Sequence, residues 1–336
     1  MYDLVKDQVT LVGVLENQNA FSINLWESIY CPEKKRDMEQ LFGTRERKNE
    51  EQIGELEIKY KLLNSGGHNG AISSIETCLQ RPILLTCSVQ DQTVRIWDYN
   101  TCKCVLTKTF IVTQENRVAS EPLTCASLHP SGYYMAVGLH DNIKVYHMIH
   151  DDDGLRHFHT YDIKKAKKIK FSSGGQYLCA ATDKHIYLLG TFSLEQICKL
   201  DWPSQQISSL AFNPNDSILS VTSADGYIQK YDLVQMKKNG DASIKKEFEH
   251  RDITFVHDKS DDHKCVAVGQ EHKAGASLFL IDKKDEYEVK HIRPELEAGY
   301  KNQPLLRLNG VALVQTYINN IRNLVCVTNR GTVRVV

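Results

Sequence analysis

One stretch of this 336-residue chain concentrates side chains that can bind a metal ion. Four histidines and three aspartates lie between His147 and His159, and both residue types are ligands that zinc and other divalent metals accept. The same residues also fit a simpler description, in which a strand ends, an acidic hairpin loop follows and the next strand begins. We adopt the simpler description and predict that the chain binds neither a metal nor another cofactor.

A second stretch concentrates positive charge. Five lysines lie within seven residues: Lys164, Lys165, Lys167, Lys168 and Lys170. If this segment is a strand, side-chain alternation places Lys165 and Lys167 on one face and the other three on the opposite face. Such lysines are candidate contacts for an acidic partner, for example the acidic tails of tubulin. The alternative interpretation is a solvated channel wall or rim.

Histidine, serine and aspartate also occur together in a way that invites comparison with nucleophilic catalysis. His68, Ser88 and Asp91 supply the three side-chain types of a hydrolytic triad. The sequence contains no glycine-rich phosphate loop and no G-x-S-x-G, H-E-x-x-H or EF-hand pattern. Buried polar side chains need hydrogen-bond partners in any fold, so a structural network explains the same residues. We therefore predict that the chain is not an enzyme.

Composition excludes several other classes of protein. A hydrophobic content of 41% excludes a mainly disordered chain. With 41 Lys and Arg against 42 Asp and Glu, overall charge does not favour nucleic acid as a partner. No apolar run is long enough for a helix that spans a membrane. Ten cysteines without a C-x-x-C pair indicate free thiols in a reducing compartment.

The elements that must position these residues repeat along the chain. One unit contains an alternating apolar run, a polar turn, a second apolar run, a tight turn with Asp and a third strand, most completely over Ile72–Asp98. Six units start near residues 72, 123, 166, 207, 253 and 310, at intervals of 51, 43, 41, 46 and 57 residues. This spacing is close to the period of WD40 repeats, which is roughly 40–45 residues.

Each unit predicts one four-stranded blade of a β-propeller. Its short runs are rich in β-branched and aromatic residues, and neighbouring blades around a common axis bury the faces that one blade leaves open. His68, Ser88, Asp91 and Trp97, with the adjoining Gly and Asp, resemble the GH…S…D…WD pattern of WD40 repeats. This resemblance implies that the four side chains form a buried hydrogen-bonded chain between strands. The expected fold class is all-β, a WD40-type propeller.

We expect one propeller over residues 1–336, with seven blades of which the first and last are incomplete. The first blade covers residues 7–63 and carries an insertion at 33–52, where 12 of 20 residues are charged. The last blade has three strands. A free strand edge invites pairing, so either the two incomplete blades complete each other or the chain is a piece of a longer protein. We favour the second explanation.

Several phrases, in their order, resemble one particular WD-repeat family. They occur at Arg81–Ser88, Ser127–Gly132, Phe171–Ala181 and Ala224–Tyr231. Together they resemble the second propeller of the cilia- and flagella-associated protein 57 family, over about residues 68–233. The first 60 and last 80 residues match only loosely.

The family resemblance implies a non-enzymatic scaffold of the ciliary or flagellar axoneme. The implied partners are inner-arm dyneins, the nexin–dynein regulatory complex and the doublet microtubule, with neither nucleic acid nor membrane among them. The alternative is a WD40 adaptor of another intracellular assembly, such as a ubiquitin-ligase receptor or a transport coat. In that case we expect a cytoplasmic location.

Overall fold

Every regular element that the structure describes is a β-strand, as the repeats predict. The computed structural model describes residues 10–14, 20–24, 60–62, 67–78, 80–114, 117–120, 122–149, 154–202, 207–244, 248–255, 264–271, 275–281, 287–291, 308–315, 322–328 and 333–335. The charged insertion predicted at 33–52 lies outside these residues. Within them, no helix is long and apolar enough to cross a membrane.

The strands form antiparallel sheets in which chain neighbours are also spatial neighbours. The four-stranded sheets are β4 (Ser74–Thr77), β5 (Ile83–Ser88), β6 (Thr93–Asp98) and β7 (Lys103–Thr109); β10 (Leu123–Leu128), β11 (Tyr134–Leu139), β12 (Ile143–Met148) and β13 (Leu155–Tyr161); β14 (Lys168–Phe171), β15 (Tyr177–Ala181), β16 (His185–Gly190) and β17 (Gln196–Asp201); β18 (Ile207–Phe212), β19 (Ile218–Ser223), β20 (Tyr227–Asp232) and β21 (Lys237–Ile244); and β22 (Phe248–Phe255), β23 (Cys265–Glu271), β24 (Gly275–Ile281) and β25 (Tyr287–His291). Two three-stranded sheets are β1 (Thr10–Val14), β2 (Ala20–Asn24) and β3 (Tyr60–Leu62), and β26 (Leu308–Gln315), β27 (Arg322–Thr328) and β28 (Val333–Val335).

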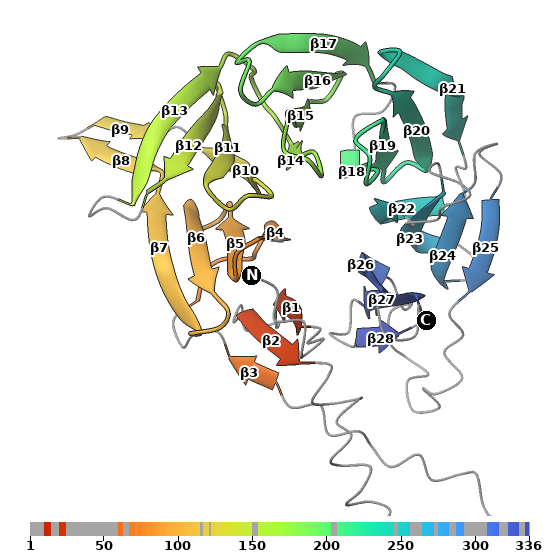
Figure 1. Cartoon of the computed structure of the whole chain (residues 1–336), viewed down its shortest axis with the longest axis horizontal. Helices are drawn as coiled ribbons and strands as arrows, with labels where there is room; N and C mark the ends of the chain where they lie inside the picture. Colours follow the sequence, from red (N-terminus) through yellow and green to blue (C-terminus); the bar gives the residue numbers. More distant parts are fainter. Residues whose placement is uncertain are drawn as a thin grey trace, which may run out of the picture.

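These sheets follow one another around a central space (Figure 1), with the first strand of each four-stranded sheet innermost. Consecutive innermost strands contact each other, from β4 through β10, β14, β18 and β22 to β26. This is the arrangement of a β-propeller, so the predicted fold class is confirmed, while the number of blades stays a prediction. The unit start expected near residue 253 falls inside β22, which begins at Phe248.

One element was not predicted from the sequence. A two-stranded hairpin of β8 (Ile111–Gln114) and β9 (Arg117–Ser120) lies in the chain between β7 and β10. Its residues account for the interval of 51 residues between the unit starts at 72 and 123, which is longer than the next two intervals. The insertion separates two sheets along the chain without separating their innermost strands, because β4 and β10 remain in contact.

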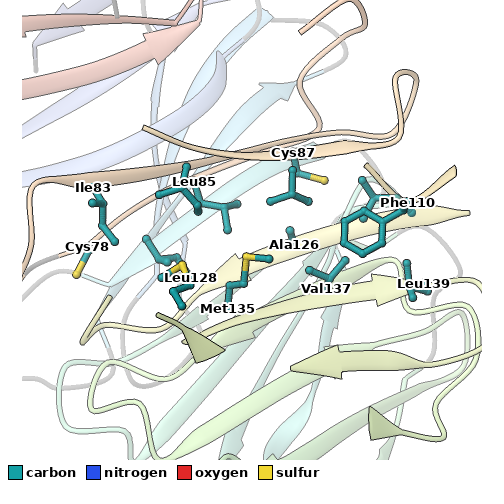
Figure 2. Close-up of a cluster of buried hydrophobic side chains, with 14 residues drawn as sticks. Cys78, Ile83, Leu85, Cys87, Phe110, Ala126, Leu128, Met135, Val137 and Leu139 are labelled. Carbon is teal, nitrogen blue, oxygen red and sulfur yellow. The ribbon is translucent and has the colours of Figure 1, made fainter. Parts of the chain in front are cut away.

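Apolar side chains fill the space between neighbouring sheets. Figure 2 shows Leu85 and Cys87 of β5 facing Ala126 of β10 and Met135 and Val137 of β11, all of them fully or almost fully buried. Burying a side chain of this kind contributes about 1.5–3 kcal/mol. Because these contacts form between sheets rather than within one, each sheet depends on its neighbours for stability.

Candidate interaction surfaces

Three of the four side chains predicted to link the strands of sheet β4–β7 meet in a hydrogen-bonded chain. The fourth member of this chain is Thr86 and not the predicted Ser88. His68 Nδ1 lies 2.9 Å from Asp91 Oδ2, and His68 Nε2 lies 2.8 Å from Thr86 Oγ1. The Trp97 indole N–H donates to the same Thr86 hydroxyl at 2.7 Å. Thr86 therefore takes the place expected for Ser88, whose hydroxyl accepts a long bond of 3.5 Å from the Asp91 backbone N–H.

Strand register explains why Thr86 is the linking residue. Thr86 pairs with Arg95 across β5 and β6, whereas Ser88 pairs with Thr93. Trp97 lies two residues beyond Arg95 on the same face of β6, so its ring is a diagonal neighbour of Thr86. Ser88 lies two residues beyond Thr86 in β5, which is roughly 7 Å along the strand, and the indole of Trp97 does not reach it. Alternation places Thr86 and Ser88 on the same face, so the register between β5 and β6 is what identifies Thr86.

The order Asp91–His68–Thr86 has the connectivity of a hydrolytic triad but is closed to a substrate. The Thr86 side chain is 0% exposed, and its hydroxyl already accepts the indole N–H of Trp97. Burial lowers the pKa of His68, and the contact with Asp91 opposes this shift only in part. The neutral ring therefore accepts a hydrogen bond from the Thr86 hydroxyl at Nε2 and donates its Nδ1–H to Asp91. These residues join strands of one sheet, and the geometry provides no accessible nucleophile.

The lysines predicted as a partner contact are divided among different environments. Lys164 and Lys165 are exposed in the connection between β13 and β14. Lys167 forms an ion pair with Asp183. Because a carboxylate already neutralises one of these three lysines, the segment is less basic as a surface than its sequence indicates. Contact with an acidic partner through these lysines stays a prediction.

The other two lysines belong to the inner wall of the ring. Lys168 and Lys170 share one face of β14, as alternation predicts, while the residues between and after them are buried. Lys170 Nζ lies 3.0 Å from Glu76 Oε1 on β4. The Glu76 carboxylate raises the pKa of Lys170, the Asp252 carboxylate adds to this effect, and together they outweigh burial. Lys170 therefore remains charged and contributes to contacts between sheets.

Glu76 connects three consecutive sheets through their innermost strands. Its Oε2 accepts hydrogen bonds from the Ser127 hydroxyl at 2.8 Å and from the Leu128 N–H at 2.7 Å, both on β10. The Ser127 oxygen in turn accepts from the Phe171 N–H of β14 at 3.1 Å. With the ion pair to Lys170, Glu76 joins β4 to both of the following inner strands.

Asp252 makes the corresponding contacts elsewhere in the ring. Its Oδ1 accepts from the Ser209 hydroxyl of β18 at 2.7 Å, and its Oδ2 accepts from the Val311 N–H of β26 at 3.1 Å. Sequence reasoning missed Asp252 and Glu76 because their partners lie 43 to 59 residues away in the chain. Both strands also contain other polar residues, so the sequence of β4 or of β22 does not single out its acidic residue.

The histidine-rich segment does not gather metal ligands in the part of it that is described. His147 stacks on Tyr134 with ring centroids 4.8 Å apart, and His157 Nε2 lies 2.8 Å from the Thr160 hydroxyl. Residues 150–153 lie outside the described part of the chain. Among the described residues, no three His, Cys, Asp or Glu side chains are placed to hold one metal ion.

The C-x-C pair contributes to packing around the buried tryptophan. Cys102 and Cys104 pack against Trp97 and Leu84. The cysteines at positions 78, 87, 102, 104, 125, 179, 198 and 265 are free thiols. This agrees with the sequence-based prediction of unpaired thiols.

Comparison with known families identifies two repeat types. The model "WD domain, G-beta repeat" matches residues 60–98 and 194–232. The first of these matches includes His68, Thr86, Asp91 and Trp97. A second model, the CXCXC repeat, matches residues 95–105, which contain the C-x-C pair. The chain therefore contains WD40 repeats.

Curated proteins with similar sequences share one name. Cilia- and flagella-associated protein 57 of Mus musculus is 32% identical over 178 residues, which are 53% of this chain and 13% of that protein. Cilia- and flagella-associated protein 57 C of Tetrahymena thermophila is 31% identical over 185 residues, 52% of this chain and 13% of its own length. Protein 57 A of the same organism is 24% identical over 178 residues, with 53% and 13% covered. The chain thus spans only about an eighth of the length of these relatives.

Proposed function

Because the chain carries WD40 repeats and is homologous over about half its length to cilia- and flagella-associated protein 57, we propose that it is a WD-repeat protein of the cilium or flagellum. Within that location it acts as a scaffold of the axoneme that helps to position or regulate inner-arm dyneins. The observation that carries this proposal is the homology to relatives whose names refer to cilia and flagella.

The way in which the sheets are joined supports a scaffold role. Glu76 and Asp252 each hydrogen-bond to innermost strands of other sheets, and apolar side chains fill the spaces between sheets. A ring held in this way keeps its turns and outer strands at fixed relative positions. Several partners can then be bound in a defined geometry, which is what placing a motor on a filament requires.

The buried triad-like chain supports a non-catalytic role. Nucleophilic catalysis needs a hydroxyl that a substrate can reach, next to a base. The Thr86 hydroxyl beside His68 is fully buried and hydrogen-bonded to Trp97. Function therefore resides in surfaces, and the proposed partners are inner-arm dyneins, the nexin–dynein regulatory complex and other proteins on the doublet microtubule.

Locating the protein in a ciliated cell tests this proposal. The full chain, fused to a proximity-labelling enzyme, is expected in the axoneme fraction after membranes are removed with detergent, and to be released by high salt. Labelling is expected to be stronger on inner-arm than on outer-arm dyneins, which serve as the internal control. Axonemal location with equal labelling would remove the inner-arm assignment alone. A diffuse cytosolic distribution would overturn the ciliary proposal and favour an adaptor of another assembly.

A further inference from the structure

The outermost strands of three consecutive sheets each contain a β-bulge occupied by an apolar residue. In β7, β13 and β17 the pairing register shifts, which leaves Val105, Phe158 and Ile197 opposite no partner. Their side chains are 56%, 36% and 40% exposed. A bulge redirects the side chain that it carries, so its recurrence gives the outermost strand of each of three consecutive sheets an exposed apolar group. We call β7, β13 and β17 together the outer rim.

Bulges in the innermost strands of this fold carry polar residues. Register shifts in the innermost strands β10, β18 and β22 leave Thr124, Ser208 and Arg251 unpaired. The apolar character of the outer rim is therefore not a general property of bulges in this fold. It is shared by the outermost strands β7, β13 and β17 (Figure 1). In β21, the outermost strand of the next sheet, the register shift instead spans Gly240, Asp241 and Ala242.

Each exposed apolar residue of the outer rim has an exposed cation two residues away in its strand. Lys103 accompanies Val105, Arg156 accompanies Phe158, and Lys199 accompanies Ile197. The three strands together contain four basic residues, Lys103, Lys108, Arg156 and Lys199, and one acidic residue, Asp201. The outer rim is thus both apolar and basic, unlike the chain as a whole, which is nearly neutral.

One exposed apolar residue of the outer rim borders a pocket, and another belongs to a partly exposed aromatic cluster. Val105 lies at a pocket of about 160 Å³ between sheets β4–β7 and β10–β13, which is also lined by Ile83, Ile96, Leu106 and Met148. Phe158 lies edge-on to Tyr134 with centroids 5.2 Å apart, and Phe192, which is 55% exposed, lies 5.6 Å from Tyr134. Aromatic and apolar residues of this kind are enriched at the centres of protein interfaces.

We propose that the outer rim binds an acidic segment of a partner protein that also carries apolar side chains. The apolar groups of the partner contact Val105, Phe158 and Ile197, and its carboxylates face Lys103, Arg156 and Lys199. Charge complementarity selects this partner over a basic or neutral segment. The inference rests on the scaffold part of the proposed function and is independent of the ciliary location.

Photo-crosslinking at single positions of the full chain tests the inference. The probe is p-benzoylphenylalanine, placed in separate chains at position 105, 158 or 197, and at the exposed control positions of Val89 and Val234. Irradiated whole cells are extracted and the crosslinked peptides are sequenced by mass spectrometry. We expect the three rim positions to capture one shared partner segment with an excess of Asp and Glu next to apolar residues. The control positions are expected not to capture it.

Charge reversal adds a measurement that does not depend on identifying the partner beforehand. With the probe at 158, the double substitution Arg156→Glu and Lys199→Glu is expected to lower the crosslink yield about tenfold, because like charges then face the segment. The exposed Lys184→Glu, outside the rim, is the matched control and is expected to change the yield by less than about twofold.

Three results would overturn the inference: rim yields no higher than those at the controls, a captured segment that is basic or neutral, or a yield unaffected by the double reversal. Since crosslinks are read from whole-cell extracts, they report on the rim wherever the protein resides. If the protein is axonemal but no specific crosslink forms at the outer rim, only the rim inference is contradicted. If the protein is cytosolic and the rim crosslink forms, only the ciliary location is contradicted.

Discussion

The innermost strands and the outer rim of this ring use side chains in opposite ways. On the innermost strands, Glu76 and Asp252 make hydrogen bonds between sheets, so polar groups stabilise the centre. On the outer rim, Val105, Phe158 and Ile197 remain exposed, so apolar groups remain available for contact. The comparison teaches that apolar character without burial is not a guide to structural importance in this chain.

This difference has a thermodynamic consequence. Leaving a buried polar group without its partner costs about 1–3 kcal/mol, whereas substitutions at exposed positions usually change stability by less than about 0.5 kcal/mol. Substitutions in the interior are therefore expected to affect folding, and those on the outer rim are expected to affect binding alone. Unfolding measurements on both groups of variants test that separation.

Acidification is expected to give the largest effect on the interior. His250 lies on the innermost strand β22, fully buried and edge-on to Phe279 at 4.9 Å, and burial lowers its pKa to about 4. In the unfolded chain the ordinary pKa is 6.5, so the unfolded state binds the proton first. Stability is expected to fall as pH drops from about 6.5 towards 4, by about 3 kcal/mol in total from this group. Urea unfolding at a series of pH values measures the loss.

Two histidine variants assign that loss to its source. His250→Gln is expected to remove about 3 kcal/mol of the loss of stability in acid. Burial also lowers the pKa of His68 and of His129, so these two residues still make the variant less stable in acid. His157→Gln, on the outer rim strand β13 and exposed, is the matched control and is expected to keep the full sensitivity. An unchanged acid response in the His250 variant would show that this inner-strand histidine is not the group responsible.

The hydroxyl that links the buried chain of sheet β4–β7 is expected to give the next effect. Thr86→Val keeps the shape of the side chain but leaves His68 Nε2 and the Trp97 N–H without their shared partner. We expect a loss of about 2 kcal/mol in the free energy of unfolding, measured with urea at pH 7. Ser88→Ala is expected to cost less than about 1 kcal/mol. Equal costs would mean that Ser88, as the sequence pattern indicated, shares the linking role.

The sequence was sufficient for the fold because the repeats carry local signals. Alternation and turn residues within each unit predict the strands, and their period predicts the ring. The same reasoning placed His68, Asp91 and Trp97 together, since their spacing matches a pattern within one unit. The sequence pattern pointed to Ser88 and not to Thr86. Which of the two meets Trp97 depends on how β5 pairs with β6, and a motif does not state that pairing.

Features that depend on contacts between units were not predictable in this way. Glu76 finds Ser127 and Leu128 about one repeat away, in the neighbouring sheet, so no local pattern indicates the contact. The bulges at Val105 and Phe158 arise from the register between two strands, which the sequences of β7 and β13 do not state. The ion pair between Lys170 and Glu76 of another sheet was unpredictable for the same reason, while binding of an acidic partner by these lysines stays a prediction.

The smallest expected effect completes the comparison, because it concerns stability on the outer rim. A chain with Val105→Ser, Phe158→Ser and Ile197→Ser is expected to unfold in urea within about 0.5 kcal/mol per substitution of the parent, since these side chains are exposed. Val137→Ser, which replaces a fully buried apolar residue of β11, is the matched control and is expected to cost at least about 2 kcal/mol. A triple variant as unstable as that control would place the three side chains in the core. A stable triple variant would show that these three side chains are not needed for folding, as the binding proposal requires.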